Sequence, residues 1–237
     1  MVSSSANPDK GTFSVFDFFR TSLEKLSYSS SQLFQDLFVL YCLNDKRNGY
    51  FVEFGAADGV AYSNSYLLES AYQWTGILSE PAKVWLNDLE GNRTSIIDKR
   101  CVWSKSGEVL TFSETIIAEL STISDYVNSD RNSAIRENKD LYKVTTISLN
   151  DLLEQHNAPY DIDYLSIDTE GSEFEILNAF DFTKYSIKII TIEHNHSDRR
   201  QDIHKLLTEN GYTRVFSEIT AFDDWYIKNS LTFNTRI

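Results

Sequence analysis

The stretch from Tyr50 to Val60 most constrains what this chain can fold into. Its first five residues, Tyr50–Phe54, are apolar except for Glu53, a pattern typical of a strand that is buried on both faces. A tight turn, Gly55-Ala-Ala-Asp-Gly59, follows, and residues 62–72 are expected to form a helix. Small residues in such a turn let the backbone approach a ligand closely. A strand, a glycine turn and a helix in this order predict a nucleotide pocket at the carboxyl end of the strand.

The residues of this turn also indicate the type of cofactor. Their spacing is not the G-x-G-x-x-G pattern of NAD-binding turns. An acid, Glu53, lies near the end of the strand, where it would repel a diphosphate and attract a cationic amino group. The turn therefore favours S-adenosylmethionine over NAD. On this motif alone, a Rossmann-type NAD-dependent oxidoreductase and an ordinary βα turn without a ligand stay open as alternatives.

Composition argues against several classes of partner. The 237 residues carry a formal net charge of −13. This charge disfavours nucleic acid and anionic lipid, because proteins bind both through cationic side chains. The two cysteines, Cys42 and Cys101, lack the spacing of a metal site or a disulfide framework, which fits a reducing compartment. No apolar leader and no run of about 18 apolar residues occurs. We therefore expect a cytoplasmic protein without membrane insertion, in an oligomeric state that the sequence leaves open.

Strands and helices alternate along most of the chain. Apolar runs predict further strands at residues 74–79, 99–104, 160–168 and 187–194, with helices between them. This alternation is typical of an α/β fold with a mostly parallel sheet and helices on both faces. Residues 213–228 are expected to add an antiparallel hairpin at the end of the chain.

The predicted domain organisation follows from the same pattern. Residues 1–45 are expected to form an N-terminal helical extension that packs on the core, and residues 46–237 the S-adenosylmethionine-binding domain. Residues 115–143 are polar and without a firm period, which predicts a lid-like insertion over the site or a variable loop. Pro81 is expected to open a helix over residues 82–89.

Several motifs together resemble the FkbM-type family of S-adenosylmethionine-dependent methyltransferases. The matching segments, which lie between about residues 28 and 228, are Ser31–Leu40, Phe51–Gly59, Ser63-Asn64, Glu80-Pro81, Val102–Gly107, Ile147–Leu153, Asp163–Leu177 and Ile192–His194. The resemblance implies a class I methyltransferase fold, a seven-stranded sheet whose last strand is antiparallel. It also implies an O-methyltransferase that forms methyl ethers on hydroxyls of sugars, glycans or related natural products. The chain departs from the family where Asn is often found, at Ala57 or Asp58, and where Val is often found, at Thr169.

The resemblance also implies a set of cofactor-binding residues. Glu53 would meet the methionine ammonium or order water beside it, and Glu80 would accept both ribose hydroxyls in a charge-assisted contact. Cys101 and Val102 would flank the adenine. The full set expected at the cofactor is Glu53, Gly55, Ala56, Ala57, Asp58, Ser63, Asn64, Glu80, Pro81, Cys101, Val102 and Asp168.

Polar residues after two neighbouring predicted strands form the candidate catalytic group. Asp168, Glu193 and Asn195 resemble the layout of catechol O-methyltransferases, and such oxygen ligands suit Mg²⁺ or Mn²⁺. A metal beside a hydroxyl lowers the pKa of that hydroxyl. The alternative is that Asp168 only orients the substrate and that Glu193 pairs with Arg or Lys. His194, which adjoins Glu193, is the predicted general base, because the unperturbed pKa of histidine is near 6.5.

Four further residues are candidates for contact with the acceptor. Glu170 would bind sugar hydroxyls or the metal, or would complement a helix N-terminus together with Glu173. Gln35 and Asp36 share a polar helix face with Gln32, and this face would otherwise be solvated. His196 is the alternative base. A non-enzymatic binding module on a degenerate methyltransferase fold is the remaining alternative, and it would require loss of the cofactor-binding groups.

Overall fold

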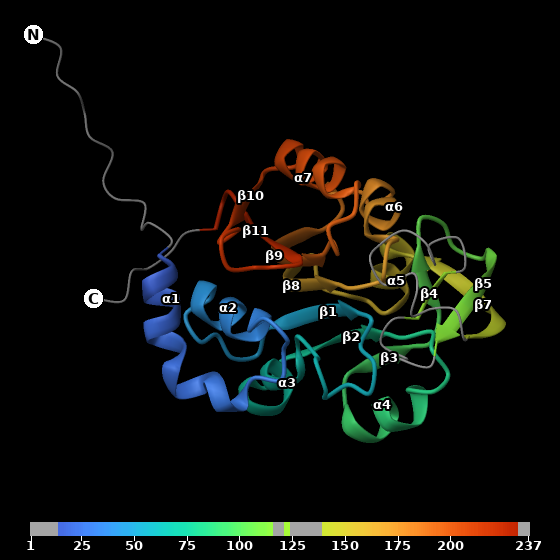
Figure 1. Cartoon of the computed structure of the whole chain (residues 1–237), viewed down its shortest axis with the longest axis horizontal. Coiled ribbons are helices and arrows are strands. Elements are labelled where there is room, and N and C mark those ends of the chain that lie inside the picture. The colour runs from blue at the N-terminus through green and yellow to red at the C-terminus, as the bar shows by residue number, and fades with distance from the viewer. Residues whose placement is uncertain (1–13, 116–120, 124–138, 232–237) are drawn as a thin grey trace, which may run out of the picture.

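The computed structural model describes residues 14–115, 121–123 and 139–231 (Figure 1). The helices are α1 (Val15–Ser22), α2 (Gln35–Cys42), α3 (Tyr66–Tyr72), α4 (Leu86–Asn92), α5 (Leu149–Gln155), α6 (Glu173–Asn178) and α7 (Arg200–Glu209), with a 3₁₀ helix at Leu23–Tyr28. The strands are β1 (Tyr50–Phe54), β2 (Thr75–Ser79), β3 (Ile96–Asp98), β4 (Cys101–Trp103), β5 (Val109–Thr115), β6 (Thr122–Ile123), β7 (Lys139–Ser148), β8 (Asp161–Ile167), β9 (Ser186–Glu193), β10 (Tyr212–Val215) and β11 (Asp223–Lys228). Most of the expected lid-like insertion at residues 115–143 lies outside the described residues.

Seven strands form the central sheet, in the order β10-β11-β9-β8-β1-β2-β3. Five neighbouring strands of this sheet, β9, β8, β1, β2 and β3, pair in parallel. Strand β11 runs antiparallel to both of its neighbours, β9 and β10. The predicted α/β fold with an antiparallel last strand, the class I methyltransferase fold, is therefore confirmed. The hairpin expected over residues 213–228 is formed by β10 and β11.

Helices cover both faces of this sheet because successive side chains of each strand point to opposite faces. Val52 and Leu165 belong to a core cluster with residues of α5, α6 and α7. Phe51 and Tyr164, one position earlier on the same strands, belong to a second cluster with residues of α1, α2, α3 and α4. Each strand is thus buried on both sides, which explains why its sequence is a nearly continuous apolar run.

The N-terminal helices pack on the second cluster. Phe18 of α1 and Phe38 of α2 are fully buried and lie against Trp225 of β11, with ring centroids 6.1 Å and 4.5 Å from the indole. Figure 1 shows α1 and α2 side by side over the sheet, and the two helices contact each other. None of the helices in the described ranges is both long enough and apolar enough to cross a membrane.

A strand forms within the predicted residues 99–104, at Cys101–Trp103, but it is not the edge strand of the central sheet. Ile96–Asp98 forms this edge strand, and the chain leaves the sheet at Asp98 because the Asp98 carboxylate accepts hydrogen bonds from the backbone N–H and the guanidinium of Arg100. Cys101–Trp103 then pairs with β7 in a second, four-stranded sheet, β4-β7-β5-β6, which was not predicted (Figure 1). This second sheet lies beside the carboxyl end of the first one and contributes a wall of the site.

The helix predicted at residues 82–89 begins later, at Leu86. The N–H of Ala82 is instead bound by the carboxylate of Glu80 at 2.7 Å, which holds the chain after Pro81 in an irregular conformation. This irregular segment before α4 places Trp85 at the edge of a cavity, which is described below.

Candidate active site

The register of the parallel strands brings several polar residues to one edge of the sheet. Phe54 pairs with Ser79 on one side and with Ile167 on the other, and Ile167 pairs with Ile192. The strands therefore end at almost the same level. The residues at or just beyond these ends are Gly55, Glu80, Asp168 and Glu193, as expected for the ligand-binding edge of an open α/β sheet.

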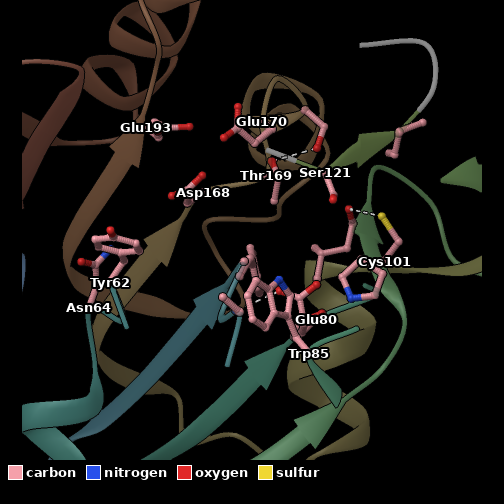
Figure 2. A pocket seen from close by; sticks show the side chains of 18 of the residues that line it. Tyr62, Asn64, Glu80, Trp85, Cys101, Ser121, Asp168, Thr169, Glu170 and Glu193 are labelled. Carbon is pink, nitrogen blue, oxygen red and sulfur yellow. Dashed lines mark hydrogen bonds between the residues drawn. The ribbon is translucent and has the colours of Figure 1, made fainter. Parts of the chain in front are cut away.

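A cavity of about 350 Å³ lies at this edge (Figure 2). Eleven of the predicted site residues line it, namely Gly55, Ala57, Asn64, Glu80, Pro81, Cys101, Val102, Asp168, Glu170, Glu193 and Asn195. Eight of the predicted site residues lie outside its lining, namely Glu53, Ala56, Asp58, Ser63, Gln35, Asp36, His194 and His196. The structure thus brings together the residues at the strand ends but not the histidines or the residues of α2.

Gly55 is required by the close approach of two strands. Its φ is +74°, and a Cβ built on it would lie 2.0 Å from the backbone oxygen of Asp168. Any side chain at position 55 would push the ends of β1 and β8 apart. The glycine therefore sets the width of the cavity floor, in addition to exposing backbone to a ligand.

Glu80 holds the turn after β1 and at the same time faces the cavity. Its two carboxylate oxygens accept the N–H groups of Ala57 at 2.9 Å and Ala82 at 2.7 Å. The side chain is buried, and burial raises the pKa of Glu80 to about 7, although these two hydrogen bonds oppose the shift. The carboxylate is thus fixed in position and poorly solvated, which strengthens a hydrogen bond from a ligand hydroxyl.

The end of the cavity next to Glu80 is apolar. Its walls come from Trp85 before α4, Cys101 and Val102 of β4, Phe112 of β5 and Ile123 of β6. Burial raises the pKa of the Cys101 thiol to about 12, so this cysteine is a neutral wall residue and not a nucleophile. The arrangement fits a flat, uncharged ring between apolar surfaces.

The opposite end of the cavity carries three carboxylates. One oxygen from each of Asp168, Glu170 and Glu193 lies within 4.8 Å of the others, and Figure 2 shows the three side chains directed toward a common space. Burial raises the pKa of Asp168 to about 7. Burial and the charge of Asp168 raise the pKa of Glu193 well above its usual value. Such a group is stable only when it binds protons or a cation.

Asn195, predicted as a metal ligand, lines the cavity beside the carboxylates. Its amide nitrogen donates to Glu193 at 2.7 Å and to Glu170 at 3.2 Å, so Asn195 orients two of the three carboxylates. Both Glu170 and Asn195 have a left-handed backbone, with φ of +57° and +41°. Positive φ is uncommon outside glycine and is found at functional sites.

The loop that carries Glu170 is braced from two directions. The carboxylate of Glu173 accepts the N–H groups of Thr169 and Gly171 and the hydroxyl of Thr169. The hydroxyl of Thr122 in β6 donates to the backbone oxygen of Glu170 at 2.9 Å. Of the two glutamates predicted near this helix start, Glu173 therefore stabilises the loop, and Glu170 is left to face the cavity.

The interpretation of Glu53 as a contact of the methionine ammonium is not supported. Its side chain points to the α3 face of the sheet, because residues 52 and 54 point to the other face. There its oxygens accept the N–H of Asn64 at 2.6 Å and the hydroxyls of Ser63 and Ser65. Glu53 thus lies beneath the cavity and fixes the loop that contributes Asn64 to the lining.

His194 is not placed to act as the general base. It is buried on the side of α7 and β11, its Nδ1 accepts the N–H of His196 at 3.0 Å, and its Nε2 lies 3.9 Å from Asp224. Burial lowers the pKa of His194 to about 4. Because β9 alternates, Glu193 faces the cavity and the next side chain cannot. His196 is exposed and also lies outside the lining.

The predicted polar face of Gln35 and Asp36 is buried and does not reach the cavity. Gln35 donates to Asp223 at 2.7 Å and accepts the N–H of Leu33 at 2.9 Å. Asp36 accepts the hydroxyl of Ser29 at 2.6 Å, and burial raises the pKa of Asp36 to about 6. Both side chains therefore anchor the start of α2, and a different residue of this segment, Gln32, lines the cavity.

Asp36 predicts a measurable pH dependence of stability. Its folded-state pKa of about 6 lies above the usual 3.8, so between these values the folded chain binds a proton that the unfolded chain has lost. The stabilisation is therefore complete below the unfolded pKa and is lost as pH rises through about 6. Urea unfolding should show wild type losing about 2 kcal/mol relative to Asp36→Asn between about pH 4 and 7. The exposed-site variant Glu24→Gln is the control, and parallel pH profiles for wild type and Asp36→Asn would contradict the assignment.

Several lining residues were not found from the sequence. They are Gln32, Phe54, Ala61, Tyr62, Ser79, Trp85, Phe112, Ser121, Ile123, Thr169, Ser172 and Phe222. Ser79 and Thr169 could have been predicted, because each lies next to the end of a predicted strand. Phe112 and Ile123 could not have been predicted, because their place depends on how the second sheet lies against the first.

Comparison with known proteins identifies the family. The model of the methyltransferase FkbM domain matches residues 53–214. The chain belongs to this family. Membership makes it a methyltransferase whose methyl donor is S-adenosylmethionine, and the match contains all four strand ends that line the cavity. A search of curated protein sequences finds no match.

Solved structures similar to this FkbM-domain chain include two proteins of low sequence identity. A chain of a fibrillarin/Nop5p complex is 9% identical, with a TM-score of 0.39 and coverage of 78% of this chain and 73% of that one. A precorrin-6y C5,15-methyltransferase from Geobacter metallireducens is 11% identical, with a TM-score of 0.42 and coverage of 81% and 85%. The fold assignment itself rests on the observed strand order.

Proposed function

We propose that this methyltransferase is an O-methyltransferase that acts on a hydroxyl of a sugar, a glycan or a related natural product, with the help of a divalent cation. The observation that carries the proposal is the group of three carboxylates, Asp168, Glu170 and Glu193, at one end of the cavity. These side chains supply the two things that methylation of a hydroxyl needs from a protein, a polar contact for the hydroxyl and an acceptor for its proton.

The residues at the other end fit S-adenosylmethionine. Glu80 would accept the ribose hydroxyls, and the apolar walls at Trp85 and Cys101 would receive the adenine. Asn64 lines the cavity with a buried Oδ1 that has no hydrogen-bond partner among the described residues, an acceptor that suits an ammonium group. When bound, the cofactor supplies a sulfonium methyl group that a nucleophilic oxygen attacks.

The carboxylates fit a divalent cation by their number and type. Hard cations such as Mg²⁺ and Mn²⁺ prefer carboxylate oxygens, and no Lys or Arg is among the described residues that line the cavity beside Asp168 and Glu193. Asp168, Glu170 and Glu193 would hold the ion, with Asn195 orienting two of them. A bound cation would lower the pKa of a hydroxyl beside it.

Asp168 takes the place of His194 as the proposed proton acceptor. It lines the cavity at the end of β8, and its carboxylate lies next to the place where a hydroxyl beside the carboxylate cluster would lie. Asp168 would hold the acceptor hydroxyl and take its proton on a carboxylate oxygen. Glu193, which lies beside it, would share the negative charge.

The two alternative functions are less well supported. An NAD-dependent oxidoreductase is disfavoured by the match to the methyltransferase FkbM domain and by four acids in the cavity lining, which would repel a diphosphate. A degenerate binding module would be expected to have lost the groups at the strand ends. Gly55, Glu80 and Asp168 are all present and all line the cavity.

Labelled methyl transfer tests the proposal. Incubation with methyl-labelled S-adenosylmethionine and a set of neutral glycosides should give an alkali-stable methyl ether, since ethers survive base whereas methyl esters do not. Treatment with EDTA should reduce the product to background, and Mg²⁺ or Mn²⁺ should restore it, because the cation neutralises the three carboxylates. Titration of the chain with Mn²⁺ alone should show one site in wild type and none in Glu193→Gln. Full activity in chelator would remove the metal from the proposal, and label found only on nitrogen or carboxyl groups would contradict O-methylation.

A further inference from the structure

Tyr62 is a strained residue at the mouth of the cavity. Its φ is +61°, in the left-handed region that a bulky side chain avoids, and the residue is 55% exposed while also lining the cavity. A strained conformation persists only when the surrounding structure imposes it, and such residues gather at ligand sites. The left-handed backbone of Tyr62 therefore needs a structural cause, and its position at the cavity suggests a role in ligand binding.

The cause lies on both sides of Tyr62 in the loop between β1 and α3. Before it, the carboxylate of Asp58 accepts the N–H groups of Val60 and Ala61, both at 2.8 Å. After it, buried Glu53 accepts the N–H of Asn64 at 2.6 Å and the hydroxyls of its two serine neighbours. The backbone on each side of Tyr62 is thus fixed by a carboxylate.

A second set of contacts ties this loop to the segment before α2. The hydroxyls of Ser30 and Ser31 both donate to the backbone oxygen of Ser63, at 3.2 Å and 3.4 Å, and Ser31 forms a parallel bridge with Tyr62 itself. Gln32, the next residue of that segment, also lines the cavity. The strained backbone is therefore clamped between two elements, and the Tyr62 ring is the part left free to meet a ligand.

The position of the ring separates it from the proposed cofactor contacts. Figure 2 shows Tyr62 beside Asn64, away from Cys101 and on the side where Asp168 lies. Phe222, from the loop before β11, is another lining residue, and its backbone oxygen accepts the N–H groups of His194 and Asn195 next to the carboxylates. An aromatic face next to three carboxylates suits a molecule with a ring and a hydroxyl.

The charge of the residues that line the cavity limits which class of acceptor molecule can bind. Among the described residues that line the cavity, the acids are Glu80, Asp168, Glu170 and Glu193, and none is Lys, Arg or His. The whole chain carries a net charge of −13. With the four carboxylates ionised, one divalent cation and the single net positive charge of S-adenosylmethionine would still leave the site negative, so a uronate, a sulfated sugar or a phosphorylated sugar would be repelled.

We propose that Tyr62 is the platform on which the ring of the acceptor stacks, and that this acceptor is a sugar without negative charge. The inference rests on the proposed function. It assigns a binding residue to the ring of the acceptor, which the carboxylates do not contact. The aromatic face receives the apolar face of the sugar ring, and the ring hydroxyls are then directed toward Asp168. Tyr62 thus determines acceptor affinity, whereas the carboxylates determine turnover.

The test distinguishes the effect of the Tyr62 ring on acceptor binding from the effect of its backbone conformation. Tyr62→Asn removes the ring but tolerates the left-handed conformation, and Tyr62→Phe keeps the ring and removes only the hydroxyl. For a neutral methyl glycoside, Tyr62→Asn should raise KM about 3- to 10-fold with little change in kcat, the scale of one aromatic contact, and Tyr62→Phe should stay near wild type. Affinity for S-adenosylmethionine, measured by calorimetry, should not change in either variant. Tyr160→Asn removes another exposed tyrosine, at the opposite end of the strands, and is the matched control.

A binding experiment keeps this inference distinct from the proposed function. Saturation-transfer NMR on the enzyme loaded with S-adenosylhomocysteine should detect neutral methyl glycosides but not the corresponding methyl uronosides, and Tyr62→Asn should lose the signal. If glycosides bind through Tyr62 but no methyl group is transferred, the proposed function fails and the platform stands. If uronosides bind as well as glycosides, if no glycoside binds, or if Tyr62→Asn weakens cofactor binding in proportion, the platform proposal is overturned.

Discussion

Asp168→Asn is expected to lower kcat by about 10²–10⁴-fold, the usual effect of removing a general base. Asparagine keeps the size of the side chain, so the wall of the cavity is preserved, but it cannot take up a proton and carries no charge for a cation. The effect should appear in kcat and in the response to Mg²⁺. Acceptor KM should change much less, since the ring of the acceptor is held elsewhere. Steady-state kinetics with a saturating methyl donor measures both quantities.

Two comparisons make this result specific. Asp161→Asn changes an exposed aspartate at the other end of the same strand and should leave activity unchanged. His194→Gln should not reproduce the loss, because His194 lies outside the cavity lining. If Asp168→Asn retained wild-type kcat while His194→Gln lost it, the base would have to be returned to the histidine, and the side-chain positions at the end of β9 would have to change in the working enzyme.

Glu80→Ala is expected to weaken S-adenosylmethionine binding by about 1.5–3 kcal/mol, the range for a hydrogen bond to a charged group. The carboxylate of Glu80 is buried and fixed by the N–H groups of Ala57 and Ala82, so its loss cannot be replaced by solvent or by a neighbouring side chain. Titration calorimetry gives the change directly. Glu90→Ala, at an exposed glutamate that pairs with Lys99, is the control and should bind the cofactor as wild type does.

A cofactor analogue distinguishes a ribose contact from a structural role of Glu80. If Glu80 accepts the ribose hydroxyls, wild type should bind a 2′-deoxy analogue more weakly than S-adenosylmethionine, and Glu80→Ala should bind the two almost equally. A variant that loses affinity for both molecules by the same factor relative to wild type would instead mean that Glu80 only shapes the turn after β1.

The position of His194 illustrates a general limit on reading a site from strand ends. Residues 193 and 194 are adjacent, and both are polar, but a strand directs them to opposite faces. Glu193 therefore joins the carboxylates, whereas His194 enters the packing between β9, β11 and α7. Glu53 points to the same face as position 55 but lies one repeat earlier in the strand, beneath the cavity, where the loop before α3 binds its carboxylate. The sequence alone therefore predicts which side chains face the cavity only when the last residue of each strand is known without an error of even one position.

Much of the fold followed from local sequence. The apolar runs at β1, β2, β8 and β9 predict strands without knowledge of their partners, because strands buried on both faces need apolar side chains at nearly every position. Their alternation with helices predicts a parallel sheet, and the ends of parallel strands must lie at one edge. Gly55, Glu80, Asp168 and Glu193 were therefore expected near one another, and all four line the cavity.

Only the tertiary structure decided what completes this edge. The second sheet pairs residues 101–103 with residues 146–148, a separation that no local pattern specifies, and it brings Phe112 and Ile123 to the cavity. Tyr62 is placed by hydrogen bonds of its loop neighbours to Asp58 and Glu53 and by a bridge to a segment about 30 residues earlier, which impose a backbone that its own side chain disfavours. Local sequence determined that β1, β2, β8 and β9 form and where they end, because that depends on each segment alone. Long-range pairing decided which side chains face the ligand, because that depends on partners distant in the chain.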